Sequence, residues 1–284
     1  MEYQQIQSPS FYINEASVGR TYFRKQLNTI EIILKKRHAK ISKKDIHELR
    51  IAVKKIKSLS ALVLFCEPDF RIRKFMKPFK KIFTVAGKLR ELQLEKSRLK
   101  KMQLLGSLKD YSHHLNSRLK KKKHLFFSLA NAKFIRKLQK RSKMILSGFD
   151  SVSKTLINHF LEEKRNEIIG LVATANLKEN DAHRLRKTLK ELYYTLLIFD
   201  AKDTRFKNID GFQQLLGKWH NDVVLKDYLQ KALDNKDEAA NELKIISEAR
   251  DKISFESNSL FQQIKAATHG IDSSLFKPGK LSVQ

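Results

Sequence analysis

Residues 45–57, DIHELRIAVKKIK, return in altered form as residues 181–194, DAHRLRKTLKELYY. Both copies carry the pattern acid-x-His-x-Leu-Arg-x-x-x-Lys, where x is any residue. Neither copy alternates apolar and polar residues as a half-buried strand does, and both repeat their apolar residues at helical spacing. The repeated pattern therefore predicts two related helices, around which the rest of the chain is arranged.

On a helix, the first copy presents a basic stripe and, beside it, an apolar stripe. Successive residues turn by about 100°, so positions three, seven and ten apart fall on one side. The basic stripe consists of His47, Arg50, Lys54 and Lys57, and the apolar stripe consists of Ile46, Leu49, Val53 and Ile56. The second copy carries His183, Arg186 and Lys190 on its basic stripe and Leu185, Leu189, Leu192 and Leu196 on its apolar stripe. Each helix therefore has a face for packing and a face of cations.

An aspartate stands two residues before the histidine in each copy, as Asp45 and Asp181. Ser42 followed by Asp45 is similar to a capping box, with Asp in place of Glu. A carboxylate near a helix N-terminus also interacts favourably with the helix dipole. Both aspartates are therefore expected to start their helices; the alternative is that each pairs with a basic residue and orients it.

The composition favours helices throughout. Of the 284 residues 41% are hydrophobic, which is enough to bury the core of one large domain or two medium ones. The chain has nine Gly and four Pro, and its long runs rich in Lys, Leu and Ile show no strand alternation. The predicted fold class is all-α, a helical bundle. The single cysteine, Cys66, rules out an internal disulfide and a cysteine metal cluster.

The charge balance is strongly basic, with 58 Lys and Arg against 30 Asp and Glu and a formal net charge of +28. Self-repulsion on this scale costs stability, so the charge favours a polyanionic partner: nucleic acid, an anionic membrane surface or inorganic polyphosphate. No stretch approaches the roughly 18 apolar residues that a membrane span requires. The polar residues 1–10 lack the apolar region of a signal peptide, so the expected location is the cytoplasm.

A second element accompanies each motif. Residues 86–91, AGKLRE, follow the first copy, and residues 216–221, LGKWHN, follow the second. This order predicts two similar helical halves, about 17–147 and 148–268, within a single domain spanning 17–268. A lead of residues 1–16 and a tail of residues 269–284 complete the chain. We expect pseudo-two-fold symmetry between the halves, which would bring the two basic stripes to face each other across a shared central groove.

The two motif copies, each followed by its Gly-Lys box, resemble the CHAD family, the conserved histidine α-helical domain. The resemblance covers about residues 15–270. It implies a helical bundle with internal two-fold symmetry, a basic central groove, inorganic polyphosphate as the ligand and association with polyphosphate granules. It implies binding without an established catalytic reaction. The chain departs from the family pattern at Tyr193, where Arg or Lys is frequent, and at Glu91 and Asn221, which replace the Asp of the box.

The predicted polyphosphate-binding residues are those of the two basic stripes, followed by four more distant cations. They are His47, Arg50, Lys54, Lys57, His183, Arg186 and Lys190, and then Lys43, Arg90, Lys187 and Lys218. Arg binds phosphate oxygens through two N–H groups at once, and Lys supplies a mobile point charge. Imidazole can donate an N–H, and a nearby phosphate favours its charged form. The competing interpretation is that the stripes are ordinary solvated helix surface.

Other functions remain open at this stage. The basic run 120–143, which contains Phe126, Phe127 and Phe134, is the strongest competitor and would suit a nucleic-acid-binding or ribosome-associated protein. A metal-dependent polyphosphate phosphohydrolase is a third possibility. His47 and His183 lack a His, Asp or Glu partner three or four residues on, and their basic neighbours repel cations, so no metal site is expected. No catalytic constellation or phosphate-loop motif is present, so we expect neither an enzyme nor a cofactor.

Overall fold

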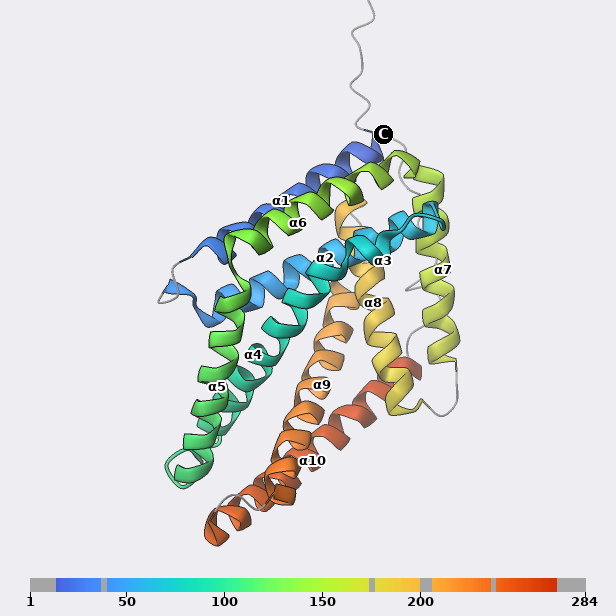
Figure 1. Cartoon of the computed structure of the whole chain (residues 1–284). Helices are drawn as coiled ribbons and strands as arrows, with labels where there is room; N and C mark the ends of the chain where they lie inside the picture. Colours follow the sequence, from blue (N-terminus) through green and yellow to red (C-terminus); the bar gives the residue numbers. More distant parts are fainter. Residues whose placement is uncertain (1–13, 37–39, 174–176, 200–205, 236–238, 270–284) are drawn as a thin grey trace, which may run out of the picture.

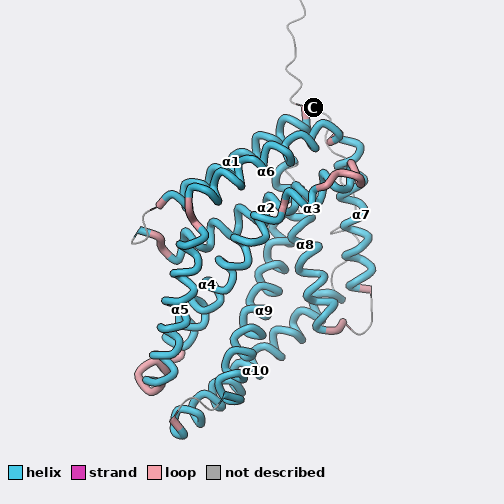
Figure 2. Tube along the Cα trace, in the orientation of Figure 1, coloured by secondary structure: helices cyan, strands magenta, loops and turns pink. Residues whose placement is uncertain are grey.

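In the computed structural model, residues 14–36, 40–173, 177–199, 206–235 and 239–269 are described. In order along the chain, the helices are α1 (Glu15–Lys35), α2 (Lys43–Cys66), α3 (Ile72–Phe75), α4 (Lys77–Lys101), α5 (Lys109–Leu129), α6 (Ala132–Ser147), the short 3₁₀ turn η2 (Gly148–Ser151), α7 (Lys154–Val172), α8 (Glu179–Phe199), α9 (Phe206–Asn235) and α10 (Ala240–His269). These ranges contain helices and turns and no strand (Figure 2). The predicted all-α class is confirmed.

The helix α2, which carries the first motif copy, lies at the centre of the bundle (Figure 1). It packs against α1 and α4 of its own half and against α7 and α8 of the other half. Two antiparallel pairs, α4 with α5 and α9 with α10, extend from this centre toward the same side of the molecule (Figure 1). The second motif copy lies on α8, which also contacts α2 directly. The two motif helices are therefore neighbours, although the two copies lie far apart in the sequence.

The apolar stripes of both motif helices lie in the main core. Ile46, Leu49, Val53 and Ile56 are at most 4% exposed, and Leu185, Leu189, Leu192 and Leu196 are at most 2% exposed. Burying one such side chain stabilises the fold by about 1.5–3 kcal/mol. This core includes residues from both halves, such as Phe23 and Trp219. With the apolar stripes held in the core, the basic stripe beside each one has a fixed direction.

The start of α2 shows how the sequence fixes the motif helix. Ser42 accepts a hydrogen bond from the backbone N–H of Asp45 at 3.1 Å, and Asp45 accepts one from the N–H of Ser42 at 2.8 Å. This is the predicted capping box. Asp45 also pairs with Lys36 at 2.5 Å. Burial opposes ionisation of Asp45, but the hydrogen bonds from Lys36 and Ser42 outweigh it and lower the pKa of Asp45.

The second aspartate is also placed at a helix start, because Asp181 accepts a hydrogen bond from the backbone N–H of Lys178 at 3.3 Å. Across the described ranges, none of the helices is both long and apolar enough to cross a bilayer.

Candidate functional site

A cavity of about 780 Å³ lies between α2 and α4 on one side and α8, α9 and α10 on the other. Near α2 and α8 its lining is cationic and consists of His47, Arg50, Lys54, Arg90, Arg186, Lys218 and His220. Farther along α4, α9 and α10 the lining includes carboxylates, namely Glu91, Glu95, Asp222 and Glu256. We call this space the cation cavity and its two parts the cationic end and the carboxylate end.

The carboxylate end is internally neutralised. Arg98 of α4 forms an ion pair with Glu256 of α10. Glu95 accepts hydrogen bonds from the hydroxyl of Tyr111 at 2.6 Å and from Arg118 at 2.8 Å. Glu91 accepts one from the hydroxyl of Tyr228 at 2.9 Å. At this end of the cavity the protein therefore supplies cations and donors to its own carboxylates.

The cationic end is different, because positive charges from both motif copies meet there. Arg50 and Lys54 come from α2 and Arg186 comes from α8, and Lys190 of α8 lies close to these three without lining the cavity. All four side chains are half-buried. Among the described residues, none of the four forms an ion pair with a carboxylate. The helices α2 and α8 thus bring together four basic side chains that form no ion pair among the described residues, although Glu91 lies close enough to Arg50 to favour its charged form.

Burial and the close approach of these basic groups lower the pKa values of the two lysines. Burial, with Lys54, Arg186 and Arg50 close by, lowers the pKa of Lys190 to about 6. Burial, with Arg50 and Arg186 close by, lowers the pKa of Lys54 to about 8. Both shifts have the same physical cause: an ammonium that loses water and meets other cations is less stable than a neutral amine. A bound anion would reverse both effects.

The guanidinium of Arg50 is held by α4. It donates to the carbonyl oxygen of Phe83 at 3.0 Å and lies over the Phe83 ring, 4.3 Å from its centroid. A side chain at Gly87 would overlap this guanidinium, so the glycine of the first Gly-Lys box leaves the space that Arg50 occupies. At Gly217, the glycine of the second box, an added side-chain carbon would meet nothing within 4 Å.

Among the described residues, the guanidinium of Arg186 is not held by a hydrogen bond and a stacked ring as that of Arg50 is. Its Nε is buried without a hydrogen-bond partner, as is Nδ1 of the adjacent His220. A buried polar atom left unpaired costs stability, and such atoms in native structures call for an explanation. Here a ligand that accepts hydrogen bonds would satisfy the Arg186 guanidinium, whose N–H groups only donate.

The second box contributes an aromatic cluster beside these cations. The ring of His183 lies 4.6 Å from Trp219 and 5.2 Å from His220, measured between centroids. Trp219 in turn stacks on Phe261 of α10 at 5.5 Å. Burial, together with Arg186, His183, Lys190 and Lys54, lowers the pKa of His220 to about 3. His220 is therefore neutral in the free protein, and its ring can donate one hydrogen bond and accept another.

Six of the eleven predicted site residues line the cationic end of the cavity: His47, Arg50 and Lys54 on α2, Arg90 on α4, Arg186 on α8 and Lys218 on α9. Lys190 and His183 are not part of the lining, but both lie close to its cations. Burial, with Lys54 and Arg186 nearby, lowers the pKa of Lys190. Burial, with Arg186 nearby, lowers the pKa of His183. Lys187 is exposed on α8 and does not line the cavity.

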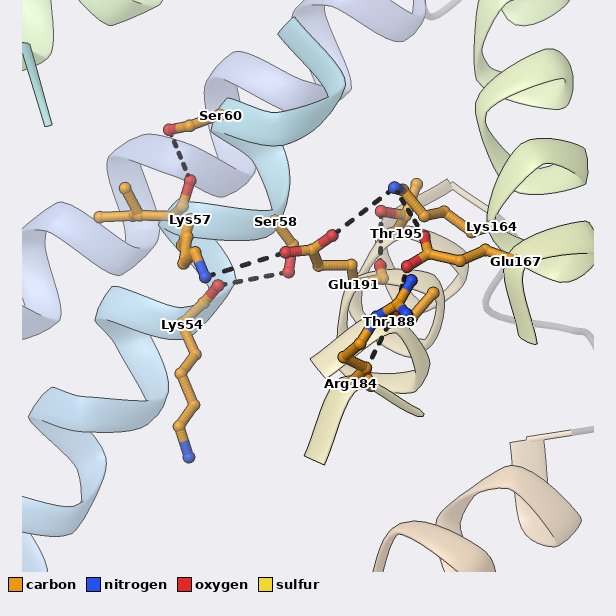
Figure 3. Close-up of polar contacts among 11 residues, drawn as sticks. Lys54, Lys57, Ser58, Ser60, Lys164, Glu167, Arg184, Thr188, Glu191 and Thr195 are labelled. Atoms are coloured by element: carbon orange, nitrogen blue, oxygen red, sulfur yellow. Dashed lines mark hydrogen bonds and ion pairs between the residues drawn. The ribbon is translucent and has the colours of Figure 1, made fainter. Parts of the chain in front are cut away.

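Lys57 and Lys43 lie elsewhere. Lys57 pairs with Glu191 of α8 at 3.9 Å, and the same carboxylate pairs with Lys164 of α7 at 3.9 Å. Figure 3 shows the Lys54 ammonium pointing away from this network, so the basic stripe of α2 divides after Lys54. Lys43 lines a separate cavity of about 300 Å³ between α2, α4 and α5.

His220 lines the cationic end of the cavity and was missed by the sequence prediction. It stands in the second box at the position that Arg90 holds in the first, and this correspondence was the available signal. The sequence prediction included Arg90 and Lys218 of the two boxes and left out the side chain of His220. In the described part of the chain, no three His, Cys, Asp or Glu residues are grouped so that they could hold a metal ion.

Comparisons with known proteins bear on this arrangement. A family model described as "CHAD domain" matches residues 21–230. The crystal structure of the CHAD domain from the plant Ricinus communis matches with a TM-score of 0.74 and 17% sequence identity, over 95% of this chain and 98% of that one. At this identity the structural likeness shows a shared fold and no more. No curated protein matches significantly.

Proposed function

The chain belongs to the CHAD domain family, and from this premise we propose that it binds inorganic polyphosphate at the cationic end of the cation cavity without turning it over. We also propose that the protein is cytoplasmic and associates with polyphosphate granules. The observation that carries it is the meeting of Arg50, Lys54, Arg186 and Lys190 without a carboxylate partner among the described residues. A fold that places four basic side chains side by side gains most from a ligand that supplies the missing anions.

The chemistry of polyphosphate suits this cluster. The polymer carries roughly one negative charge per phosphate and offers only oxygen acceptors, with no base or sugar to recognise. Arg186 can give two parallel N–H bonds to one phosphate, and Lys54 can follow a neighbouring one. The carboxylate end of the cavity limits the anion to the region between α2 and α8. A compact, flexible anion fits this region better than a broad, rigid one.

Protonation strengthens the fit. At neutral pH, Lys190 is largely neutral in the free protein, because its pKa is about 6. A phosphate beside it favours the ammonium form, so binding draws a proton from solution. The cavity thereby limits its own repulsion when empty and gains a charge when filled.

The test is calorimetric titration of long-chain polyphosphate into matched variants of α8. Arg186→Gln with Lys190→Gln removes two cations from the cluster. Arg184→Gln with Lys187→Gln removes two exposed basic residues from the same helix, so the two variants have the same formal net charge. We expect affinity to fall more than about tenfold in the first variant and by less than about twofold in the second. Equal losses in both would mean that only net charge matters, and the proposal would be wrong.

The absence of turnover is tested separately. We expect no release of inorganic phosphate when the protein is incubated with polyphosphate for hours, with or without Mg²⁺ or Mn²⁺. Release that depends on the metal and is lost in the Arg186→Gln variant would instead assign a phosphohydrolase to this cavity.

A further inference from the structure

The positive charge of the chain is unevenly distributed. Residues 70–90 contain eight Lys and Arg, residues 111–149 contain eleven, and neither stretch contains an Asp or a Glu. These two stretches therefore carry 19 of the 28 net positive charges. Except for Arg90, none of these cations lines the cation cavity. The proposed polyphosphate site leaves most of the protein's charge unexplained.

The two stretches meet on one side of the fold. The short helix α3 contacts both α6 and α4, and α6 also contacts α4 directly. Arg141 of α6 lies over the ring of Phe75 in α3, 5.9 Å from its centroid. Figure 1 shows α3 beside α6, above the α4–α5 pair. The outward cations of α3, the start of α4 and α6 are therefore neighbours.

Ten of these cations are exposed and form what we call the acid-free face. They are Arg73, Lys74, Lys77, Lys80, Lys81, Lys133, Arg136, Lys137, Lys140 and Lys143. Within the described parts of the chain none of the ten makes an ion pair. Exposed lysines elsewhere do so, as Lys35 does with Glu31 and Lys88 with Glu91. An uncompensated cationic surface of this size is the electrostatic mark of a polyanionic partner.

A membrane is a poor partner for this face. A helix that lies in a bilayer interface buries its own apolar side in the lipid. The apolar side of α6 is already used in the core, where Phe134, Ile135, Leu138 and Ile145 are at most 8% exposed. Met144 is the one large apolar side chain of α6 that is exposed, at 45%. The face therefore offers charge without the apolar groups that anchor a protein in lipid.

We propose that the acid-free face binds the phosphate backbone of double-stranded nucleic acid, independently of the cation cavity. The row from Lys133 to Lys143 on α6 extends over about 15 Å, at 1.5 Å per residue. A duplex presents about nine charges over that length, at one per 1.7 Å of axis. Because the cations stand on packed helices and point outward, a broad rigid duplex can reach several at once. No base-reading element is implied, so the binding is independent of sequence.

The experiment measures fluorescence anisotropy of a labelled 20-base-pair DNA duplex with the full chain at several salt concentrations. The face variant is Lys133→Gln, Arg136→Gln, Lys137→Gln and Lys140→Gln. The control variant is Lys154→Gln, Lys231→Gln, Lys244→Gln and Lys252→Gln, which removes the same charge from exposed positions outside both stretches. Gln keeps the helix propensity close to that of Lys and Arg.

We expect the face variant to bind the duplex at least about tenfold more weakly and to reduce the slope of log K against log salt by about 3–4, since four phosphate contacts are lost. The control variant should change affinity by less than about threefold. Equal weakening in both variants, or none in the face variant, would overturn the proposal. So would loss of binding to vesicles containing anionic lipid while duplex affinity stays intact.

A second pair of measurements on the same proteins tests polyphosphate binding in the cavity separately from duplex binding at the acid-free face. The face variant should keep its affinity for tripolyphosphate within about twofold, and Arg186→Gln with Lys190→Gln should keep its affinity for the duplex within about threefold. If tripolyphosphate binding fails in the unaltered chain while the face variant still loses the duplex, polyphosphate binding in the cavity is wrong and the acid-free face stands. If the cavity variant loses the duplex as strongly as the face variant, the duplex is bound in the cavity and this inference fails.

Discussion

The two motif copies carry the same pattern and use their arginines differently. Arg50 of α2 donates to the Phe83 carbonyl and stacks on the Phe83 ring, so α4 holds it in place. Arg186 of α8 has a buried Nε without a partner. The first arginine therefore joins two helices, whereas the second has at least one donor without a partner among the described residues. A repeated sequence pattern therefore does not give two equivalent half-sites.

The boxes that follow the motifs extend this contrast. In the first box Gly87 makes room for Arg50, and Arg90 places a further cation beside His47. In the second box Gly217 faces open space, and His220 takes the position of Arg90 beside His183. The first side of the cavity supplies the permanent charges of Arg50 and Arg90 together with Lys54. The second side supplies Lys190, whose pKa is about 6, and a neutral His220.

The largest effect is expected when both arginines are reversed. Arg50→Glu with Arg186→Glu places two carboxylates at the cationic end, which should weaken polyphosphate binding by well over tenfold. Circular dichroism should remain helical, since the apolar stripes are unchanged. Unchanged affinity would move polyphosphate binding away from the cation cavity, with the run 120–143 as the next candidate.

The titratable side of the cavity predicts a dependence on pH. In the free protein the pKa of Lys190 is about 6, and a bound phosphate raises it. Between pH 6 and the higher pKa of the complex, binding takes up a proton, so affinity for long-chain polyphosphate should fall as pH rises, by about tenfold from pH 6 to pH 8. Calorimetry in two buffers of different ionisation enthalpy measures the uptake directly.

Two lysine variants on α8 test whether Lys190 causes the fall of polyphosphate affinity with rising pH. Lys190→Met should flatten the fall between pH 6 and pH 7.5, leaving the part that Lys54, with a pKa of about 8, contributes at higher pH. Lys187→Met, at an exposed position of the same helix, should leave the profile as it is. A profile that persists in Lys190→Met would assign the proton to another group, such as His220.

Substitutions of Arg50 and Arg186 should differ more in their effect on folding stability than in their effect on binding. Arg50→Gln removes a charge-assisted hydrogen bond and a cation–π contact and should lower the free energy of unfolding by about 1–3 kcal/mol. Arg186→Gln removes repulsion from Lys190 and Lys54 and should leave that free energy unchanged or raise it slightly. Urea unfolding of both variants is the measurement; an equal loss in the two would mean that the copies are structurally equivalent after all.

The sequence predicted the parts of this molecule that depend on periodicity. The apolar stripes, the capping box of Ser42 and Asp45 and the all-α class follow from spacing along one helix. The features that it missed depend on helices that are distant in the chain. Lys57 has the spacing of a cavity residue, but Glu191 lies opposite it and holds it. The different surroundings of Gly87 and Gly217 depend on where an arginine from another helix points. The symmetry between the halves and the domain limits remain predictions.

The smallest predicted effect concerns those two glycines. Gly87→Ala adds a carbon where the Arg50 guanidinium lies, and the long arginine side chain can move aside at the cost of its bond to Phe83. Polyphosphate affinity should therefore fall by about threefold, because Arg50 is displaced and not removed. Gly217→Ala meets no neighbour, so affinity should not change, and the helix should gain up to about 1 kcal/mol from the better helix former. Titration and urea unfolding of the pair test both statements. If Gly217→Ala weakens binding as much as Gly87→Ala does, the ligand approaches the backbone of the second box, and the two sides of the cavity are more alike than their arginines indicate.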